Sequence, residues 1–380
     1  MNIAQIKNYA KANEALLLET LKTLCLIPAP SGQEAARAAY CKQWLENVGA
    51  KGVYIDEALN VLFPLNCEGS DAITVFVAHT DTVFPDTKPM PYADDGDKIC
   101  CPGVGDDTAS LAVMLLLAKY CVEENIRPEG GFLFVANSCE EGLGNLKGTR
   151  RLFADYEGRI ARFISFDSNL DLINDRCVGS CRYEVEVQTQ GGHSFQRFGL
   201  PNAIACLSQM VSQIYQIEIP QKDGCRTTYN VGTISGGTSV NTIAQSAKML
   251  CEYRSEDKEC MAYMEKQFAD IFENANTGSV RVLATKVGER PCGDVAPEKI
   301  AALVQQVRPV IEDVIGMPVT TRSASTDCNI PLSLGIPAIC MGVYFGGGSH
   351  TREEWVKKDS LLPGLEAAIR TVYALMEGKQ

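Results

Sequence analysis

Residues 73–81 read ITVFVAHTD, a short run of apolar and β-branched residues that ends in a histidine and an acid. Such a run is typical of a strand that is buried on both faces of a sheet. Similar runs occur at 131–137, 163–166 and 337–343, and a helical pattern at about 108–125 separates the first two runs. Strands that alternate with helices predict an α/β domain with a mixed, largely parallel sheet flanked by helices.

The pattern changes near residue 180, where residues 182–190 (RYEVEVQTQ) alternate strictly, as in a half-exposed antiparallel strand. The patterns that follow predict a helix, two strands, a helix and a strand, at 202–217, 227–234, 247–254, 258–273 and 280–287. This order is typical of a ferredoxin-like α+β domain. We therefore expect residues 180–291 to form a domain inserted into a discontinuous α/β domain of residues 1–179 and 292–380.

Composition excludes several classes of protein. The chain has 380 residues, 46% of them hydrophobic, and a net charge of −12, which disfavours both disorder and general nucleic-acid binding. Its longest wholly apolar run, residues 111–118, is far shorter than the ~20 residues of a membrane span. The N-terminal residues lack the pattern of a signal peptide, so we expect a cytoplasmic protein without a membrane partner. The sixteen scattered cysteines favour buried free thiols over a disulfide framework.

Histidines and acids gather where the predicted strands end, the edge at which open α/β sheets bind ligands. They are His79, Asp81, Asp106, Glu140, Glu141, Asp167 and His350. Taken singly, some have structural explanations, since Asp106 precedes a helix and could cap it. Together they provide nitrogen and oxygen ligands without a thiolate, a set that suits zinc, cobalt or manganese. The five acids sum to −5, and two divalent ions would supply +4, so a two-metal site is expected.

These motifs, from residues 27–32 (IPAPSG) to residues 350–354 (HTREE), resemble in content and order the zinc metallopeptidase family of peptidase T, glutamate carboxypeptidase, acetylornithine deacetylase, succinyl-diaminopimelate desuccinylase and the aminoacylases. The resemblance implies that His79 and Asp167 hold one metal and that Glu141 and His350 hold the other. It implies that Asp106 bridges both metals and that a cis peptide follows it. An aspartate at position 167 is a peptidase T-like feature.

The same resemblance implies further roles. Asp81 would orient His79, and Glu140 would be the general base for a metal-bridged hydroxide that attacks an amide carbonyl. The inserted domain would be a lid and dimerisation domain, in which His193 stabilises the oxyanion, often from the partner subunit. Asn241 and Arg254 would bind substrate, Arg254 by gripping a carboxylate.

The sequence thus predicts a hydrolase with two Zn²⁺ per subunit, for which Co²⁺ or Mn²⁺ could substitute, and a homodimeric assembly. Its substrates would be small peptides, cleaved by a di- or tripeptidase, aminopeptidase or carboxypeptidase activity. An N-acyl amino acid deacylase is the alternative. A non-catalytic binding homologue is a remote alternative, because no expected ligand or base is missing.

Overall fold

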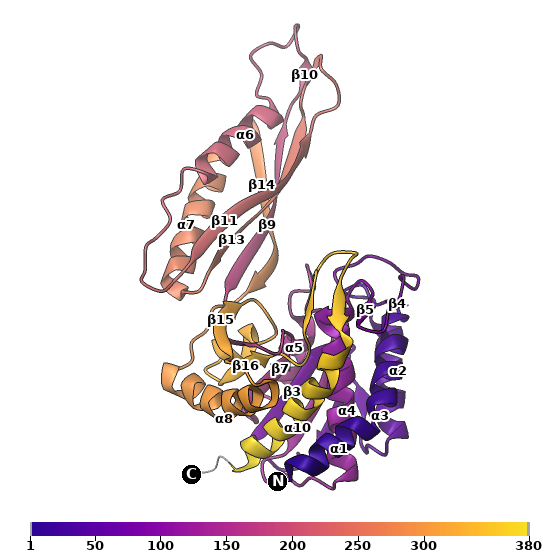
Figure 1. Ribbon diagram of the computed structural model, residues 1–380. Coiled ribbons are helices and arrows are strands. Elements are labelled where there is room, and N and C mark those ends of the chain that lie inside the picture. The colour runs from indigo at the N-terminus through magenta and orange to yellow at the C-terminus, as the bar shows by residue number, and fades with distance from the viewer. Residues whose placement is uncertain (1, 378–380) are drawn as a thin grey trace. The chain divides into compact units, whose positions relative to one another are not determined.

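The computed structural model describes residues 2–377, which divide into two compact units (Figure 1). The first unit contains the described residues up to Cys177 and those from Asp294 onward, and the second is Val178–Gly293. The first unit is therefore built from two separate stretches of chain.

An eight-stranded sheet forms the centre of the first unit. Its strands, in spatial order, are β1 (Tyr54–Ile55), β2 (Val61–Leu65), β6 (Phe132–Asn137), β3 (Ile73–His79), β7 (Ile160–Phe166), β16 (Ala338–Met341), β8 (Leu172–Cys177) and β15 (Thr320–Ala324). Strands β6, β3, β7 and β16 pair in parallel, as do β8 and β15, whereas β1–β2, β2–β6 and β16–β8 are antiparallel. The predicted mixed, largely parallel sheet is confirmed.

The two faces of this sheet bury different hydrophobic clusters, because successive side chains of a strand point to opposite sides. In β3, Phe76 and Ala78 belong to one cluster, and Val75 and Val77 belong to the other. The first cluster includes residues from α1 (Ile3–Ala12), α2 (Glu14–Cys25), α3 (Ala35–Asn47), α4 (Ser110–Glu123), α8 (Pro297–Ile315) and α10 (Leu361–Glu377). The second includes residues from α5 (Lys147–Asp155) and α9 (Asn329–Ser333). The unit is a helix–sheet–helix sandwich with the predicted flanking helices.

The parallel register decides where the polar strand ends meet. His79, the last residue of β3, lies opposite Asn137, the last residue of β6. Strand β7 runs parallel to β3 on its other side and ends at Phe166. The residues that follow these three strands therefore emerge at one edge of the sheet.

A smaller four-stranded sheet lies in the same unit. Its spatial order is β17 (Gly346–Gly347), β18 (Trp355–Lys357), β5 (Lys98–Cys100) and β4 (Ala93–Asp94). Antiparallel pairing of β18 with β5 sets Trp355 opposite Cys100. The segment around His350 is thereby held beside the segment that leads to Asp106.

The second unit has a four-stranded antiparallel sheet in the spatial order β11 (Thr227–Gly236), β13 (Ser246–Ser255), β9 (Gly179–Thr189) and β14 (Val280–Arg290). Helices α6 (Ala203–Ile214) and α7 (Lys258–Ala275) pack on one face of this sheet (Figure 1). The chain order β-α-β-β-α-β and this strand order define a ferredoxin-like fold. A short pair, β10 (Gly192–His193) with β12 (Thr242–Ile243), extends from the end of the sheet opposite to the start of β9 (Figure 1).

All sixteen cysteines are free thiols, and most are buried. Within residues 2–377, no helix combines the length and the hydrophobicity that a membrane span requires.

Candidate metal centre

His79 ends strand β3 and is almost completely buried, with 1% of its surface exposed. Its Nδ1 lies 3.1 Å from the backbone oxygen of Asp81 and 3.4 Å from Asp81 Oδ1. Its Nε2 lies 3.0 Å from Asp106 Oδ1. Burial acts to lower the pKa of His79, but the charge of Asp107 and hydrogen bonds to Asp106 and Asp81 raise it well above its usual range. The ring is held between two carboxylates, and a cation could take the place of a proton there.

The carboxylate of Asp106 lies between two imidazoles. Its Oδ1 lies 3.0 Å from His79 Nε2, and its Oδ2 lies 3.1 Å from His350 Nε2. Burial acts to raise the pKa of Asp106, but hydrogen bonds from His350 and His79 lower it below its usual range. The peptide bond between Asp106 and Asp107 is cis, as the resemblance implies. One carboxylate thus joins residues that lie 271 positions apart in the sequence.

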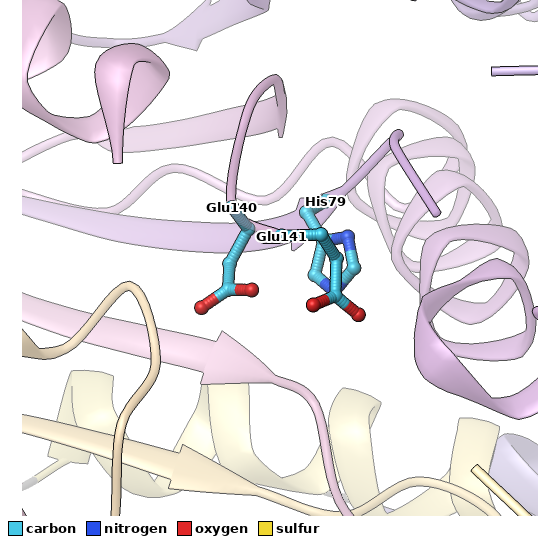
Figure 2. A group of neighbouring side chains, drawn as sticks. All are labelled: His79, Glu140 and Glu141. Carbon is cyan, nitrogen blue, oxygen red and sulfur yellow. The ribbon is translucent and has the colours of Figure 1, made fainter. Parts of the chain in front are cut away.

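Glu141 approaches the same centre from the turn after β6. Its Oε1 lies 3.0 Å from His350 Nε2. Burial and then the negative charge of Asp106 raise the pKa of Glu141 to about 7. Figure 2 shows the Glu141 carboxylate beside the ring of His79, with the Glu140 carboxylate extending alongside toward the same space. Hydrogen bonds to Asp106 and Glu141 raise the pKa of His350 to about 10.

The side chain of Asp81 organises this turn. Its Oδ1 accepts a hydrogen bond from the backbone N–H of Glu140 at 3.0 Å, and its Oδ2 accepts one from the N–H of Glu141 at 2.9 Å. The hydroxyl of Ser31 also donates to Oδ2, at 2.5 Å. Asp81 therefore contacts both the His79 ring and the turn that carries the paired glutamates.

Three groups of side chains have ligand atoms within 4.8 Å of one another: His79 with Glu140 and Glu141, His79 with Asp107 and Asp167, and Asp106 with Glu141 and His350. Every candidate metal ligand named from the sequence belongs to at least one of these groups.

Asp107 belongs to one of these groups but was not predicted from the sequence as a metal ligand. Its Oδ2 accepts a hydrogen bond from the backbone N–H of His79 at 2.8 Å. Burial and the charges of Asp106 and Asp107 raise the pKa of Asp167 well above its usual range.

Several buried residues that support the candidate ligands were also not predicted from the sequence. Arg37, 1% exposed, donates hydrogen bonds to the backbone oxygens of Leu24, Ile27 and Thr80 at 2.8 Å each. Other buried carboxylates accept from the loops that carry the candidate ligands or from their neighbours: Glu34 from Cys139 N–H, Asp327 from the Asn137 side chain, and Glu354 from the loop before Asp107. Their roles depend on burial and on hydrogen bonds to residues distant in the sequence, which no local motif reveals.

The remaining predicted site residues, His193, Asn241 and Arg254, belong to the second unit and lie at two separate positions in it. His193 and Asn241 are exposed neighbours, because β10 pairs with β12 and the N–H of Ser194 donates to the backbone oxygen of Asn241 at 2.9 Å. Arg254 binds Glu252 through Nε at 2.8 Å and through Nη2 at 3.0 Å. Arg254 lies opposite Ser180 at the start of β9, whereas Ser246 lies opposite Gln188 near its end. The pair His193 and Asn241 is thus separated from Arg254 by most of the length of the sheet.

Residues 75–374 match the family model described as peptidase family M20/M25/M40, and the chain belongs to this family. The predicted family of metallopeptidases is confirmed. Membership also confirms the predicted class of activity: the protein is a hydrolase, of the metal-dependent kind that acts on peptides or acylated amino acids.

Among curated relatives, the chain is 24% identical over 347 residues to a Mycobacterium tuberculosis protein described as a succinyl-diaminopimelate desuccinylase, DapE, covering 89% of this chain and 93% of that protein. A tripeptidase from Staphylococcus aureus has the same fold, with a TM-score of 0.76 and 23% identity over 96% of this chain and 99% of its own. The dipeptidase Dug1p from Saccharomyces cerevisiae also shares it, with a TM-score of 0.75 and 12% identity over 98% and 99% of the two chains.

Proposed function

We propose that the protein is a dinuclear zinc peptidase that cleaves amide bonds of small peptides. The observation that carries the proposal is the position of Asp106, whose two carboxylate oxygens lie 3.0 Å from His79 Nε2 and 3.1 Å from His350 Nε2. A carboxylate with each oxygen directed at a different imidazole is suited to bridge two cations.

The donor set fits two divalent ions. We assign His79 and Asp167 to one ion and Glu141 and His350 to the other, with Asp106 shared. All five offer nitrogen or oxygen atoms, the ligands that Zn²⁺, Co²⁺ and Mn²⁺ accept. Burial, and then repulsion among the acids, raises the pKa of Glu141 to about 7 and raises the pKa of Asp167, and a bound cation would offset both effects.

Bound divalent ions supply a Lewis acid that polarises the scissile carbonyl. The residues of the chain move the proton. The carboxylate of Glu140 lies beside the ligand Glu141 on the same turn (Figure 2) and accepts a proton from the attacking water. It then returns that proton to the leaving amine. Asp81 holds Glu140 in place through the 3.0 Å hydrogen bond from the Glu140 backbone N–H.

We further propose a homodimer in which His193 acts on the active site of the partner subunit. His193 and Asn241 lie beyond the end of β13 that starts at Ser246, and Arg254 lies eight residues further along that strand. At about 3.4 Å per residue, eight residues span about 27 Å, far more than a dipeptide. One small substrate therefore cannot contact Arg254 and His193 of the same lid. Phe195, Phe198 and Val240, which lie close to His193 or Asn241 in the sequence, are exposed and suit this end for contact with a second copy.

The catalytic proposal is tested by removing metal with a chelator and adding back Zn²⁺, Co²⁺ or Mn²⁺. Activity should disappear and return with the metal, and full activity in metal-free protein would contradict the proposal. The assay should compare di- and tripeptides with acetyl- and succinyl-amino acids. Preferential hydrolysis of the acylated compounds would favour the deacylase alternative, for which the relative DapE provides the precedent.

Subunit mixing tests the dimer. Glu140→Ala and His193→Ala proteins are each expected to be nearly inactive. If His193 acts in the partner, a random mixture regains about a quarter of wild-type activity, because half of the dimers are mixed and each has one complete site. If His193 acts within its own subunit, mixing restores no activity.

The sixteen free thiols are consistent with the cytoplasmic location that we also propose.

A further inference from the structure

Glu354 is a buried acid without a place in the proposed chemistry. It follows His350 by four residues, directly precedes β18, and is 1% exposed. Pairing of β18 with β5 fixes its position, and its backbone oxygen accepts a hydrogen bond from the N–H of Cys101 at 3.2 Å. Its side chain is thereby directed at the loop that leads to Asp106.

The Glu354 carboxylate accepts three backbone hydrogen bonds from this loop. Oε2 accepts from Gly103 N–H at 2.6 Å, and Oε1 accepts from Gly105 N–H at 3.0 Å and from Asp106 N–H at 2.8 Å. Converging backbone N–H groups normally form a binding site for an external anion. Here the anion belongs to the chain itself.

The loop needs glycine at both positions, and Gly105 is the one explained by the contact with Glu354. Gly103 has φ +75°, a left-handed conformation that other residues rarely adopt. A Cβ on Gly105 would lie 2.9 Å from Glu354 Oε1 and 3.0 Å from the Tyr344 hydroxyl. Only glycine allows the carboxylate to approach so closely.

Residues 350–354 therefore contact both the side chain and the backbone of Asp106. The His350 ring lies 3.1 Å from Oδ2 of its side chain, and Glu354 binds its backbone N–H. We propose that Glu354 is a positioning residue that fixes Asp106 relative to His350 and so preforms the metal centre. The inference rests on the proposed two-metal function. Glu354 is in none of the three groups of described residues that could hold a metal ion, and it acts through Asp106.

The test uses Glu354→Gln, with Glu353→Gln as the matched control, because Glu353 is the adjacent, exposed glutamate. A glutamine has only one acceptor oxygen, so its amide N–H₂ would face a backbone N–H. The measurement is titration of each metal-free protein with Co²⁺, followed by the visible absorption of the bound ion. We expect Glu354→Gln to weaken Co²⁺ binding about 10–100-fold, the usual effect of losing a residue that supports a ligand. Glu353→Gln should bind as the wild type does.

A purely structural role would lower the unfolding temperature while leaving Co²⁺ affinity and spectrum of the folded protein unchanged, and that result would overturn the inference. Gly105→Ala provides an independent variant if Glu354→Gln does not fold. It keeps the carboxylate but displaces it, so it should weaken Co²⁺ binding similarly, and unchanged binding would contradict the inference. In the double variant the two effects should not add, because both act on one contact. A wild-type protein that binds no Co²⁺ would overturn the proposed function itself.

Discussion

The carboxylate of Asp81 accepts a hydrogen bond from the backbone N–H of Glu141 at 2.9 Å, so a residue that follows one strand holds the turn after the neighbouring strand. Its other oxygen accepts from Glu140 N–H at 3.0 Å. In Asp81→Asn, the amide N–H₂ would face one of these donors. We expect the free energy of unfolding of the metal-free protein to fall by about 1–3 kcal/mol, measured by urea denaturation. Asp71→Asn, at an exposed site, is the control and should change it by less than about 0.5 kcal/mol.

Adjacent glutamates should respond differently to the same substitution. Glu140→Gln removes the proton acceptor, so turnover should fall about 10²–10⁴-fold while metal content stays at the wild-type level. Glu141→Gln weakens a ligand, so its metal content should fall together with its activity. Metal analysis of dialysed protein and initial rates measure both effects. Metal loss in Glu140→Gln, with retention in Glu141→Gln, would mean that the two roles are exchanged.

Buried Arg37 should be important for stability. Its guanidinium donates to backbone oxygens of Leu24, Ile27 and Thr80, and Thr80 directly follows His79. Arg37→Met leaves these acceptors without their donor, so unfolding should become easier by at least about 2 kcal/mol. Urea denaturation is the measurement, and Arg226→Met, at an exposed position, is the control. Equal stability of the two variants would contradict this role for Arg37.

Asp327 should make stability depend on pH. Burial and then the charge of Glu140 raise the pKa of Asp327 from 3.8 to about 6. Between these values the folded state holds a proton that the unfolded chain releases, so this carboxyl's contribution to stability is lost as pH rises from about 4 to 6. Asp327→Asn removes the effect, and its free energy of unfolding relative to wild type should rise by up to about 3 kcal/mol over this range. Urea denaturation of metal-free protein at several pH values measures this difference, and a constant difference would contradict the prediction.

The sequence predicted the central strands and the inserted domain because their patterns are local. Strands β3 and β6 are continuous apolar runs, and β9 alternates. Strands β8 (LINDRC) and β15 (TTRSA) have no such pattern, because they are the last two strands on one side of the sheet, with β15 at its edge, and remain partly polar. Their pairing depends on contacts between segments almost 150 residues apart, which composition does not reveal.

The candidate metal ligands were predictable because each follows a recognisable strand or loop. Apart from Asp81, the residues that hold those ligands were not. Glu354 was visible only as part of the motif around His350, and its three backbone donors come from a loop about 250 residues earlier. Arg37 lies in a helix whose sequence gives no sign that its guanidinium is buried.

The division of the first unit between two stretches of chain has a consequence for synthesis on the ribosome. Strand β16 lies between β7 and β8 in the finished sheet but follows the whole inserted unit in the sequence. A nascent chain that ends at residue 293 contains His79, Asp106, Glu141 and Asp167 but lacks His350 and Glu354. The inserted unit can fold as a body of its own during this interval, since domains generally fold as units. The metal centre is therefore among the last parts of the molecule to be completed.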